Sequence, residues 1–182
     1  MTNKSDELRE YKRWLLKIFI ITFMLSAIFN SISTEIVENL NITWSIIILI
    51  IVILTGIVSD MLATAVTAAK EAPFHAKAAD KKKGAKEAVK LVKNADKVSN
   101  VCGDVIGDIC GVLSGATGAL IASEISRAMG YTDITIPTLL VTATTTAIMV
   151  WGKGVGKRLG LTKTNEIVYT LGKFIAFFKI AK

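Results

Sequence analysis

Three aspartates stand in or beside long uncharged stretches of the sequence, and they are its strongest chemical signal. Asp104 and Asp108 are four residues apart, so on a helix they share one face. Asp60 ends an earlier apolar stretch. A charge at membrane depth costs about 3 kcal/mol and is generally explained by a partner or an ion pathway. Magnesium and calcium bind carboxylate, hydroxyl and carbonyl oxygens, so we expect a cation site made of Asp60, Asp104, Asp108, Ser59, Thr64 and Ser114.

The same aspartates have a second interpretation that the sequence leaves open. One or two of them stand at the cytoplasmic interface, where they are solvated or paired with Lys97, Lys153 or Lys157. An opposite charge nearby favours the ionised form of a carboxyl group, so such a pair needs no metal.

No other group of residues predicts a catalytic centre. The lone His75 has no Cys or His companions in its lysine-rich segment. Cys102 and Cys110 lie roughly 12 Å apart on a helix, too far for a disulfide, and are interpreted as small apolar fillers. The glycines of 152–157 lack the spacing of a phosphate loop, and no nucleophile stands with a base. We therefore expect no enzyme and no bound cofactor.

The elements that position these residues are apolar helices. The mean hydropathy is +0.51, and each uncharged stretch approaches the roughly 20 residues that a membrane helix needs. Residues 14–34 are interpreted as an uncleaved membrane helix, because the apolar run exceeds a signal-peptide core and no A-x-A-like site closes it. The uncharged stretches are 18–34, 39–59, 109–123 and 134–152.

The lysines and arginines predict the orientation. All 22 except Arg127 fall in the blocks 4–17, 70–97 and 153–182. By the positive-inside rule these blocks are cytoplasmic. The chain is then a multi-pass protein of the cell membrane with both termini in the cytoplasm. Basic loops beside an anionic leaflet explain the formal charge of +7, so no nucleic-acid partner is expected.

The sequence as a whole predicts an all-α integral membrane protein with four transmembrane helices. A polar segment 1–13 precedes the first helix, 14–34. Residues 70–97 form a cytoplasmic helical hairpin, and the tail 153–182 ends in a basic amphipathic helix with Phe174, Phe177 and Phe178 on it.

The third predicted span carries glycines at a strict four-residue interval: Gly103, Gly107, Gly111 and Gly115. Small residues at this spacing let membrane helices approach closely. The stripe is consistent with packing inside the bundle, with packing across a dimer, or with close backbone approach beside an ion site.

Four motifs resemble the transmembrane domain of the cyclin M/CorC family of divalent cation (magnesium) transporters, across 59–170 and within a domain placed at 43–182. A small-residue stretch, 61–67, is followed by the end of the hairpin, 91–97. Gly103 to Asp108 then has the spacing of the family's Gly-Asn-x-x-x-Asn helix, and 152–157 is similar to the turn after its third helix.

The resemblance implies a homodimer with a magnesium site between helices near the membrane midplane, and alternating access. The sequence departs from the family at several positions. Asp104 and Asp108 replace amides, and Lys153 replaces an acid that faces the metal. The paired nucleotide-sensing domains of the family have no counterpart, which suggests a separate regulatory subunit.

Two functional hypotheses follow. In the first, the chain binds or moves a divalent cation between its helices. In the second, it is a non-transporting membrane scaffold or partner subunit in which Lys153 replaces the cation, with Asp104 as the expected partner of Lys153. A third and weaker hypothesis is a membrane-surface binder that acts through 77–93.

The orientation can be tested by cysteine labelling in intact cells. A cysteine placed in 35–41 should react with an impermeant maleimide from outside, whereas one placed in 81–86 should react only after the membrane is opened. The reverse pattern would overturn the orientation.

Overall fold

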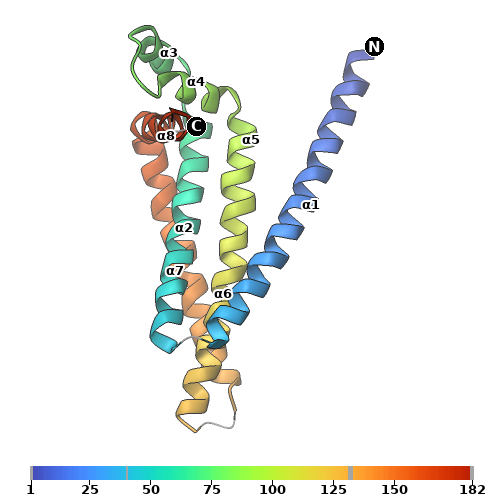
Figure 1. Cartoon of the computed structure of the whole chain (residues 1–182), viewed down its shortest axis with the longest axis vertical. Helices are drawn as coiled ribbons and strands as arrows, with labels where there is room; N and C mark the ends of the chain where they lie inside the picture. Colours follow the sequence, from blue (N-terminus) through green and yellow to red (C-terminus); the bar gives the residue numbers. More distant parts are fainter. Residues whose placement is uncertain (1, 40, 131–132, 181–182) are drawn as a thin grey trace.

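The structure, a computed structural model, describes residues 2–39, 41–130 and 133–180, and everything described there is helix or short connection (Figure 1). The segments with amphipathic or apolar patterns are therefore helical in the part of the chain that the structure describes. The elements in chain order are α1 (Thr2–Asn39), α2 (Ile42–Ala68), α3 (Ala72–Ala79), α4 (Ala85–Lys93), α5 (Ala95–Ser99), the π-helical segment η1 (Asn100–Ile106), α6 (Gly107–Ala128), α7 (Thr135–Thr162) and α8 (Thr164–Ile180).

Three helical stretches of the described chain are long and apolar enough to cross a membrane: α2, the continuous stretch α5–η1–α6, and α7. They pack side by side as a bundle. Large apolar side chains such as Ile50, Leu54 and Trp151 point outward and are exposed. In water these side chains would be unfavourable, so they indicate a lipid environment. The expectation of an all-helical membrane protein is confirmed.

The fourth predicted span, 14–34, lies within α1, which is one continuous helix from Thr2 to Asn39 and so includes most of the segment before the span. In this helix Ile18 and Leu25 pack against Val105 and neighbouring apolar residues of η1–α6. Toward its N-terminal end α1 leans away from the bundle (Figure 1). Among the described residues, α1 is not one of the three stretches that are long and apolar enough to cross a membrane. That α1 crosses the membrane therefore stays a prediction.

The closest helix contact of the bundle is made by glycines of α7 against α2. A Cβ at Gly160 would lie 2.8 Å from the Met61 carbonyl oxygen, and one at Gly156 would lie 3.3 Å from the Ile57 carbonyl oxygen. Such contacts are possible only when no side chain separates the two backbones. We predicted close approach for the glycines of α6 and did not recognise this second set.

Of the four glycines of the predicted stripe on η1–α6, only the first, Gly103 of η1, makes a comparably tight contact. A Cβ at Gly103 would lie 3.2 Å from that of Ala63. At Gly107 the nearest atoms would be 3.5 Å away, at Gly111 they would be 3.9 Å away, and at Gly115 nothing lies within 4 Å.

The predicted turn at 152–157 is part of α7, which runs on from the expected end of the span at Trp151 to Thr162. Glycine is a poor helix former, at a cost of about 1 kcal/mol relative to alanine. Here Gly152, Gly156 and Gly160 are all buried against α2, so tertiary packing offsets the local propensity.

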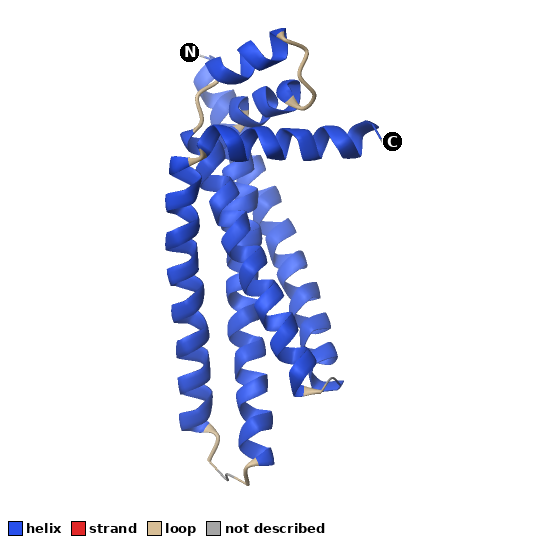
Figure 2. Cartoon of the chain, turned by 90° about the vertical axis from the view of Figure 1, so that its left-hand side faces the viewer, coloured by secondary structure: helices blue, strands red, loops and turns tan. Residues whose placement is uncertain are grey.

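The hairpin of α3 and α4 forms a layer with α8 across one end of the bundle, and α8 runs across the spanning helices (Figure 2). Phe74 of α3, Ala88 of α4 and Val168 of α8 are fully buried with Val66 from the end of α2. One apolar cluster therefore attaches the hairpin and α8 to the bundle.

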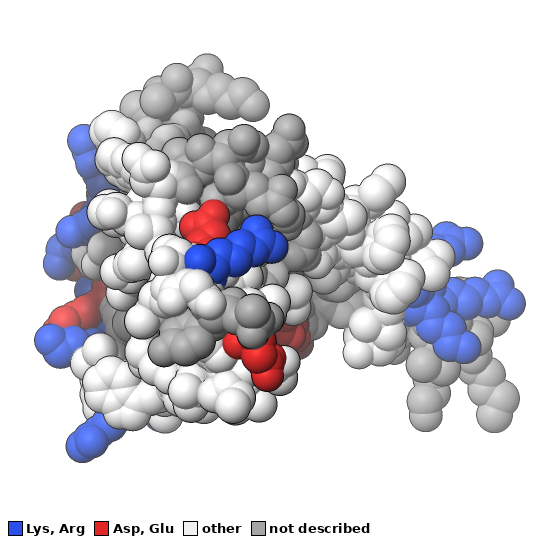
Figure 3. Space-filling view, turned by 90° about the horizontal axis from the view of Figure 1, so that it is seen from below, with Lys and Arg blue, Asp and Glu red and all other residues white. Residues whose placement is uncertain are grey.

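The two ends of the bundle differ in charge. The start of α1, the hairpin and α8 lie at the same end (Figure 1). At the opposite end, Arg127 is the only Lys or Arg between Ser123 and Thr135. Seen from that end, most of the surface is uncharged and further basic side chains appear only toward the periphery (Figure 3). Which end faces the cytoplasm stays a prediction from the positive-inside rule.

The α2–α7 contact can be tested with two alanine substitutions in one helix. Gly160→Ala should lower the free energy of unfolding by about 1–3 kcal/mol, because its Cβ meets backbone atoms that cannot move aside. Gly154→Ala should be neutral or slightly stabilising, since nothing lies within 4 Å of the added Cβ. Melting temperatures in detergent measure both, and equal values would remove the glycine contact as the constraint.

Candidate functional site

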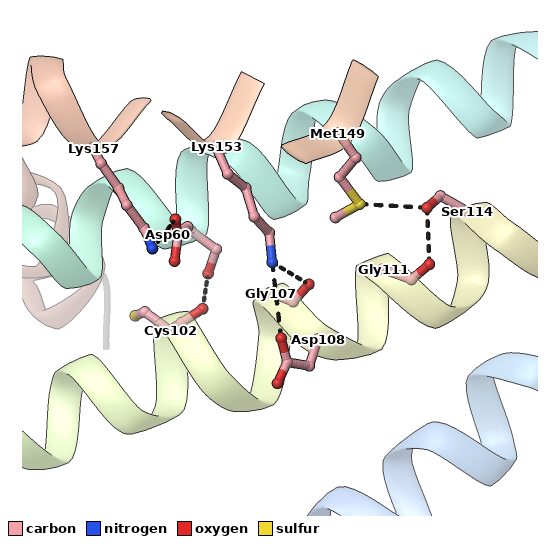
Figure 4. A network of polar contacts seen from close by, with 10 residues as sticks. Asp60, Cys102, Gly107, Asp108, Gly111, Ser114, Met149, Lys153 and Lys157 are labelled. Atoms are coloured by element: carbon pink, nitrogen blue, oxygen red, sulfur yellow. Dashed lines mark hydrogen bonds and ion pairs between the residues drawn. The ribbon is translucent and has the colours of Figure 1, made fainter. Parts of the chain in front are cut away.

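The polar centre of the bundle lies where α2, η1, α6 and α7 meet, and Asp60 of α2 is its most enclosed carboxylate (Figure 4). The Asp60 side chain is 13% exposed, and Oδ2 is 3.5 Å from Lys157 Nζ of α7. This contact is an ion pair without hydrogen-bond geometry. Oδ2 is buried, and it accepts no hydrogen bond. The Lys157 ammonium is thus a long-range partner of Oδ2, and a buried carboxylate oxygen that accepts no hydrogen bond is rare in proteins.

The π-helical segment η1 supplies a backbone oxygen next to this carboxylate. A π segment interrupts the i to i−4 hydrogen-bond ladder of a helix and is frequent at functional sites. Here the carbonyl oxygen of Cys102 accepts a hydrogen bond from Ser59 Oγ at 2.6 Å. A Cβ at Gly103 would lie 3.8 Å from Asp60 Oδ1. The lack of a side chain at this position leaves the carboxylate close to the η1 backbone.

The second polar contact is made by Lys153 of α7. Its ammonium donates a hydrogen bond to the Gly107 carbonyl oxygen at 3.3 Å and lies 3.8 Å from Asp108 Oδ1. The Lys153 side chain is 22% exposed, whereas that of Asp108 is 74% exposed. The pair is therefore open on the carboxylate side. We expected Asp104 as the partner, but the ammonium lies level with Gly107 and reaches Asp108 instead (Figure 4).

The predicted oxygen ligands are brought together only in part. Ser59 and Asp60 lie beside η1, as described above. Thr64 Oγ1 donates to the Asp60 carbonyl oxygen at 2.9 Å within its own helix. Ser114 Oγ donates to the Gly111 carbonyl oxygen at 2.9 Å and contacts Met149 Sδ at 3.4 Å. Both hydroxyls are thus engaged in or between helices rather than directed at Asp60.

The aspartates do not form a shared carboxylate cluster. Asp104 and Asp108 are exposed on the outer face of η1–α6, while Asp60 faces α7. Among the residues that the structure describes, no three His, Cys, Asp or Glu side chains are grouped so as to hold a metal ion. The described carboxylates alone do not make a metal centre.

Sequence reasoning missed the backbone part of this centre. The carbonyl oxygens of Cys102 and Gly107 are acceptors there, and side-chain types give no signal for them. Lys157 was one of three lysines considered as partners for the aspartates. Its placement beside Asp60 follows from its spacing to Lys153, since residues four apart on a helix face the same side.

The helices and the polar centre by themselves define a class of protein. It is a helical membrane domain with a polar centre between spanning helices and a basic helical layer at one end. Residues 46–181 match the family model described as Cyclin M transmembrane N-terminal domain, and the chain belongs to this family. The resemblance found in the motifs is thereby confirmed. Neither the curated proteins nor the solved structures contain a match.

The Ser59 contact with η1 can be tested by deleting its hydroxyl. Ser59→Ala should reduce the free energy of unfolding by about 1 kcal/mol, because the Cys102 carbonyl oxygen loses a donor from another helix. Ser126→Ala is the matched control, since its buried hydroxyl bonds only to Ala122 O of its own helix. If thermal unfolding in detergent shifts equally for both, the Ser59 contact does not stabilise the π segment.

Proposed function

We propose that the chain binds a divalent cation such as magnesium beside Asp60, between α2 and η1–α6, in competition with Lys153, and that this site is part of a cation pathway. Membership of a family associated with divalent cation transport supports the proposal. The domain would act in the cell membrane with both termini in the cytoplasm.

The observation that carries the proposal is the buried Oδ2 of Asp60, which accepts no hydrogen bond. Ser59, the residue before Asp60, donates to the Cys102 carbonyl oxygen of η1, and a Cβ at Gly103 would lie 3.8 Å from Asp60 Oδ1, so α2 and η1 offer carboxylate, hydroxyl and carbonyl oxygens in one region. These are the oxygen types that magnesium and calcium accept from proteins. Lys157 reaches Asp60 from an exposed position, which leaves it free to turn to the solvent.

Lys153 acts as a built-in competitor. Two unit charges at about 4 Å and an effective dielectric of about 20 interact by roughly 4 kcal/mol, and a divalent ion doubles the repulsion. An ion that came within about 4 Å of the Lys153 ammonium would therefore be strongly repelled, and the Lys157 ammonium, which lies 3.5 Å from Asp60 Oδ2, would have to leave as well. A flexible side chain that is only partly buried can move its ammonium to the interface, so binding would require this movement.

A second candidate function is a non-transporting scaffold or partner subunit. The specific observation in its favour is that Asp60 is paired with Lys157 and Asp108 with Lys153. These two aspartates then have counter-charges without a metal. In this case the lysines are permanent partners.

The outer face of η1–α6 supports association with a second copy. Val101, Asp104, Asp108 and Val112 are exposed and lie on one side of this spanning helix. Carboxylates that faced lipid hydrocarbon would be unfavourable, so they are expected at a protein interface or a water-filled cavity. We propose that a homodimer covers this face. A regulatory subunit would meet the hairpin at the cytoplasmic end.

Magnesium-dependent stabilisation tests the competition. The wild-type chain in detergent should show a saturable rise in melting temperature that requires millimolar magnesium, whereas a scaffold with permanent lysine partners should show none. Lys153→Met should bind magnesium at least about tenfold more tightly, because one repulsive charge is removed. Lys153→Glu should respond still more strongly. Lys163→Met, at the exposed end of α7, is the control and should behave like the wild type.

The site is then verified by adding Asp60→Asn to the Lys153→Met variant, which should abolish the magnesium response. If neither the Met nor the Glu variant responds to magnesium, the cation proposal is wrong. The non-transporting scaffold is then the candidate function that remains.

A further inference from the structure

The turn between α3 and α4 forms a basic hollow beside α8 that the polar centre does not use. The hollow has a volume of about 610 Å³ and is lined by Lys81, Lys82, Lys83 and Lys86, with Glu87 and Ala176 also contributing. Ala176 belongs to α8, so the lysines are gathered around one concave surface between two elements and are not spread along a loop.

The backbone of the turn brings these lysines together. Lys81 has a φ of 54° and Gly84 a φ of 82°, so two residues of the short turn adopt the left-handed conformation. The chain reverses tightly between them, and α4 starts at Ala85. At Gly84 a Cβ would lie 2.6 Å from the Lys173 backbone of α8. The turn is thereby seated directly on α8.

The four lysines have few counter-charges. Lys82 Nζ lies 3.7 Å from Asp80 Oδ2, an exposed pair. Glu87 is the only acid that lines the hollow itself. Ammonium groups held near one another repel, so an anion that enters the hollow relieves this repulsion as well as gaining its own contacts.

The two sides of α8 set the distance between the hollow and the membrane: Ala176 lines the hollow from the hairpin side, about 10 Å, one helix diameter, from the opposite side of α8. Val168, Gly172 and Ala176 are buried on the side of α8 that bears the hairpin. Phe174 and Phe177 are exposed and project from the opposite side. Because α8 runs across the ends of the spanning helices (Figure 2), this aromatic face is directed at the level of the lipid headgroups.

We propose that the hollow binds the phosphate of an anionic phospholipid headgroup, with Lys81, Lys82, Lys83 and Lys86 as its cationic ligands. Lysine ammonium groups bind phosphate as compact point charges. With its Phe174–Phe177 face in the interface, α8 carries the hollow on its outer side, one helix thickness above that face, where long lysine side chains can reach down to the headgroup phosphates. Polybasic segments this close to a membrane surface are attracted to anionic lipids. The lipid then attaches the hairpin, α8 and the bilayer to one another.

The lining favours a lipid over a soluble nucleotide. A nucleotide site ordinarily offers an aromatic or apolar surface for the base and polar groups for its edges. Among the residues that line the hollow there is no aromatic ring, and only lysine, glutamate, alanine and glycine occur. A phosphate on a lipid requires only the positive charge and the nearby membrane.

The test uses the full chain in detergent, titrated with short-chain dioctanoyl phosphatidylglycerol and monitored by melting temperature. The wild type should bind this lipid saturably and dioctanoyl phosphatidylcholine far more weakly. Lys83→Glu with Lys86→Glu should weaken phosphatidylglycerol binding at least about tenfold, since two attractive charges are reversed. Glycerol 3-phosphate, the free form of the headgroup phosphate, should bind far more weakly than the lipid.

Lys90→Glu with Lys93→Glu is the matched control. These lysines are exposed on the same face of α4 as Lys86 and outside the hollow, so their reversal should change the affinity less than about twofold. Equal losses in both variants would show diffuse surface charge and overturn the site. Equal binding of both lipids, or of glycerol 3-phosphate, would overturn the lipid assignment. If the Glu variant is unstable without lipid, Lys83→Gln with Lys86→Gln must show the same direction of loss.

Discussion

The close contact between α7 and α2 is the constraint on which the polar centre depends. Gly156 and Gly160 bring the two backbones together, and Gly152, one four-residue interval earlier, makes room for the Ile57 side chain of α2. Lys153 and Lys157 each follow one of these glycines, which turns them by about 100° from the contact and directs them toward Asp60, η1 and α6. The same segment of α7 therefore provides both the packing contact with α2 and the two lysines of the polar centre.

This coupling explains how charged groups are tolerated between spanning helices. Lys157 lies beside Asp60, and Lys153 has the Gly107 carbonyl oxygen as an acceptor. The cost of charge in a low-dielectric region is lowered by such partners. The pairing is loose, because Asp60 Oδ2 has the Lys157 ammonium at 3.5 Å but accepts no hydrogen bond. Our cation proposal rests on this looseness, and the scaffold alternative rests on the pairing.

The layer of α3, α4 and α8 has a separate physical basis. It is attached to the bundle by a buried cluster that includes Phe74 and Val168. Within the layer, Tyr169 of α8 links α8 to α3, since the Lys77 ammonium of α3 lies 4.3 Å from the centre of its ring, and Lys173 of α8 itself lies 4.5 Å from it. The lysines of the α3–α4 turn remain outside these contacts, which leaves their charge available to a ligand at the membrane surface.

The sequence by itself determined the helical membrane class, the separation of basic and uncharged ends, and the hairpin, because these follow from apolar length and charge position along the chain. It predicted Ser59 and Asp60 at the polar centre, but not the extension of α7 through Gly152–Gly160. The tertiary structure alone decided that Lys153 meets Asp108 and that the Cys102 carbonyl oxygen meets Ser59. Those contacts depend on the rotation and axial position of whole helices and on the π segment, and no local residue pattern encodes the relative placement of two packed helices.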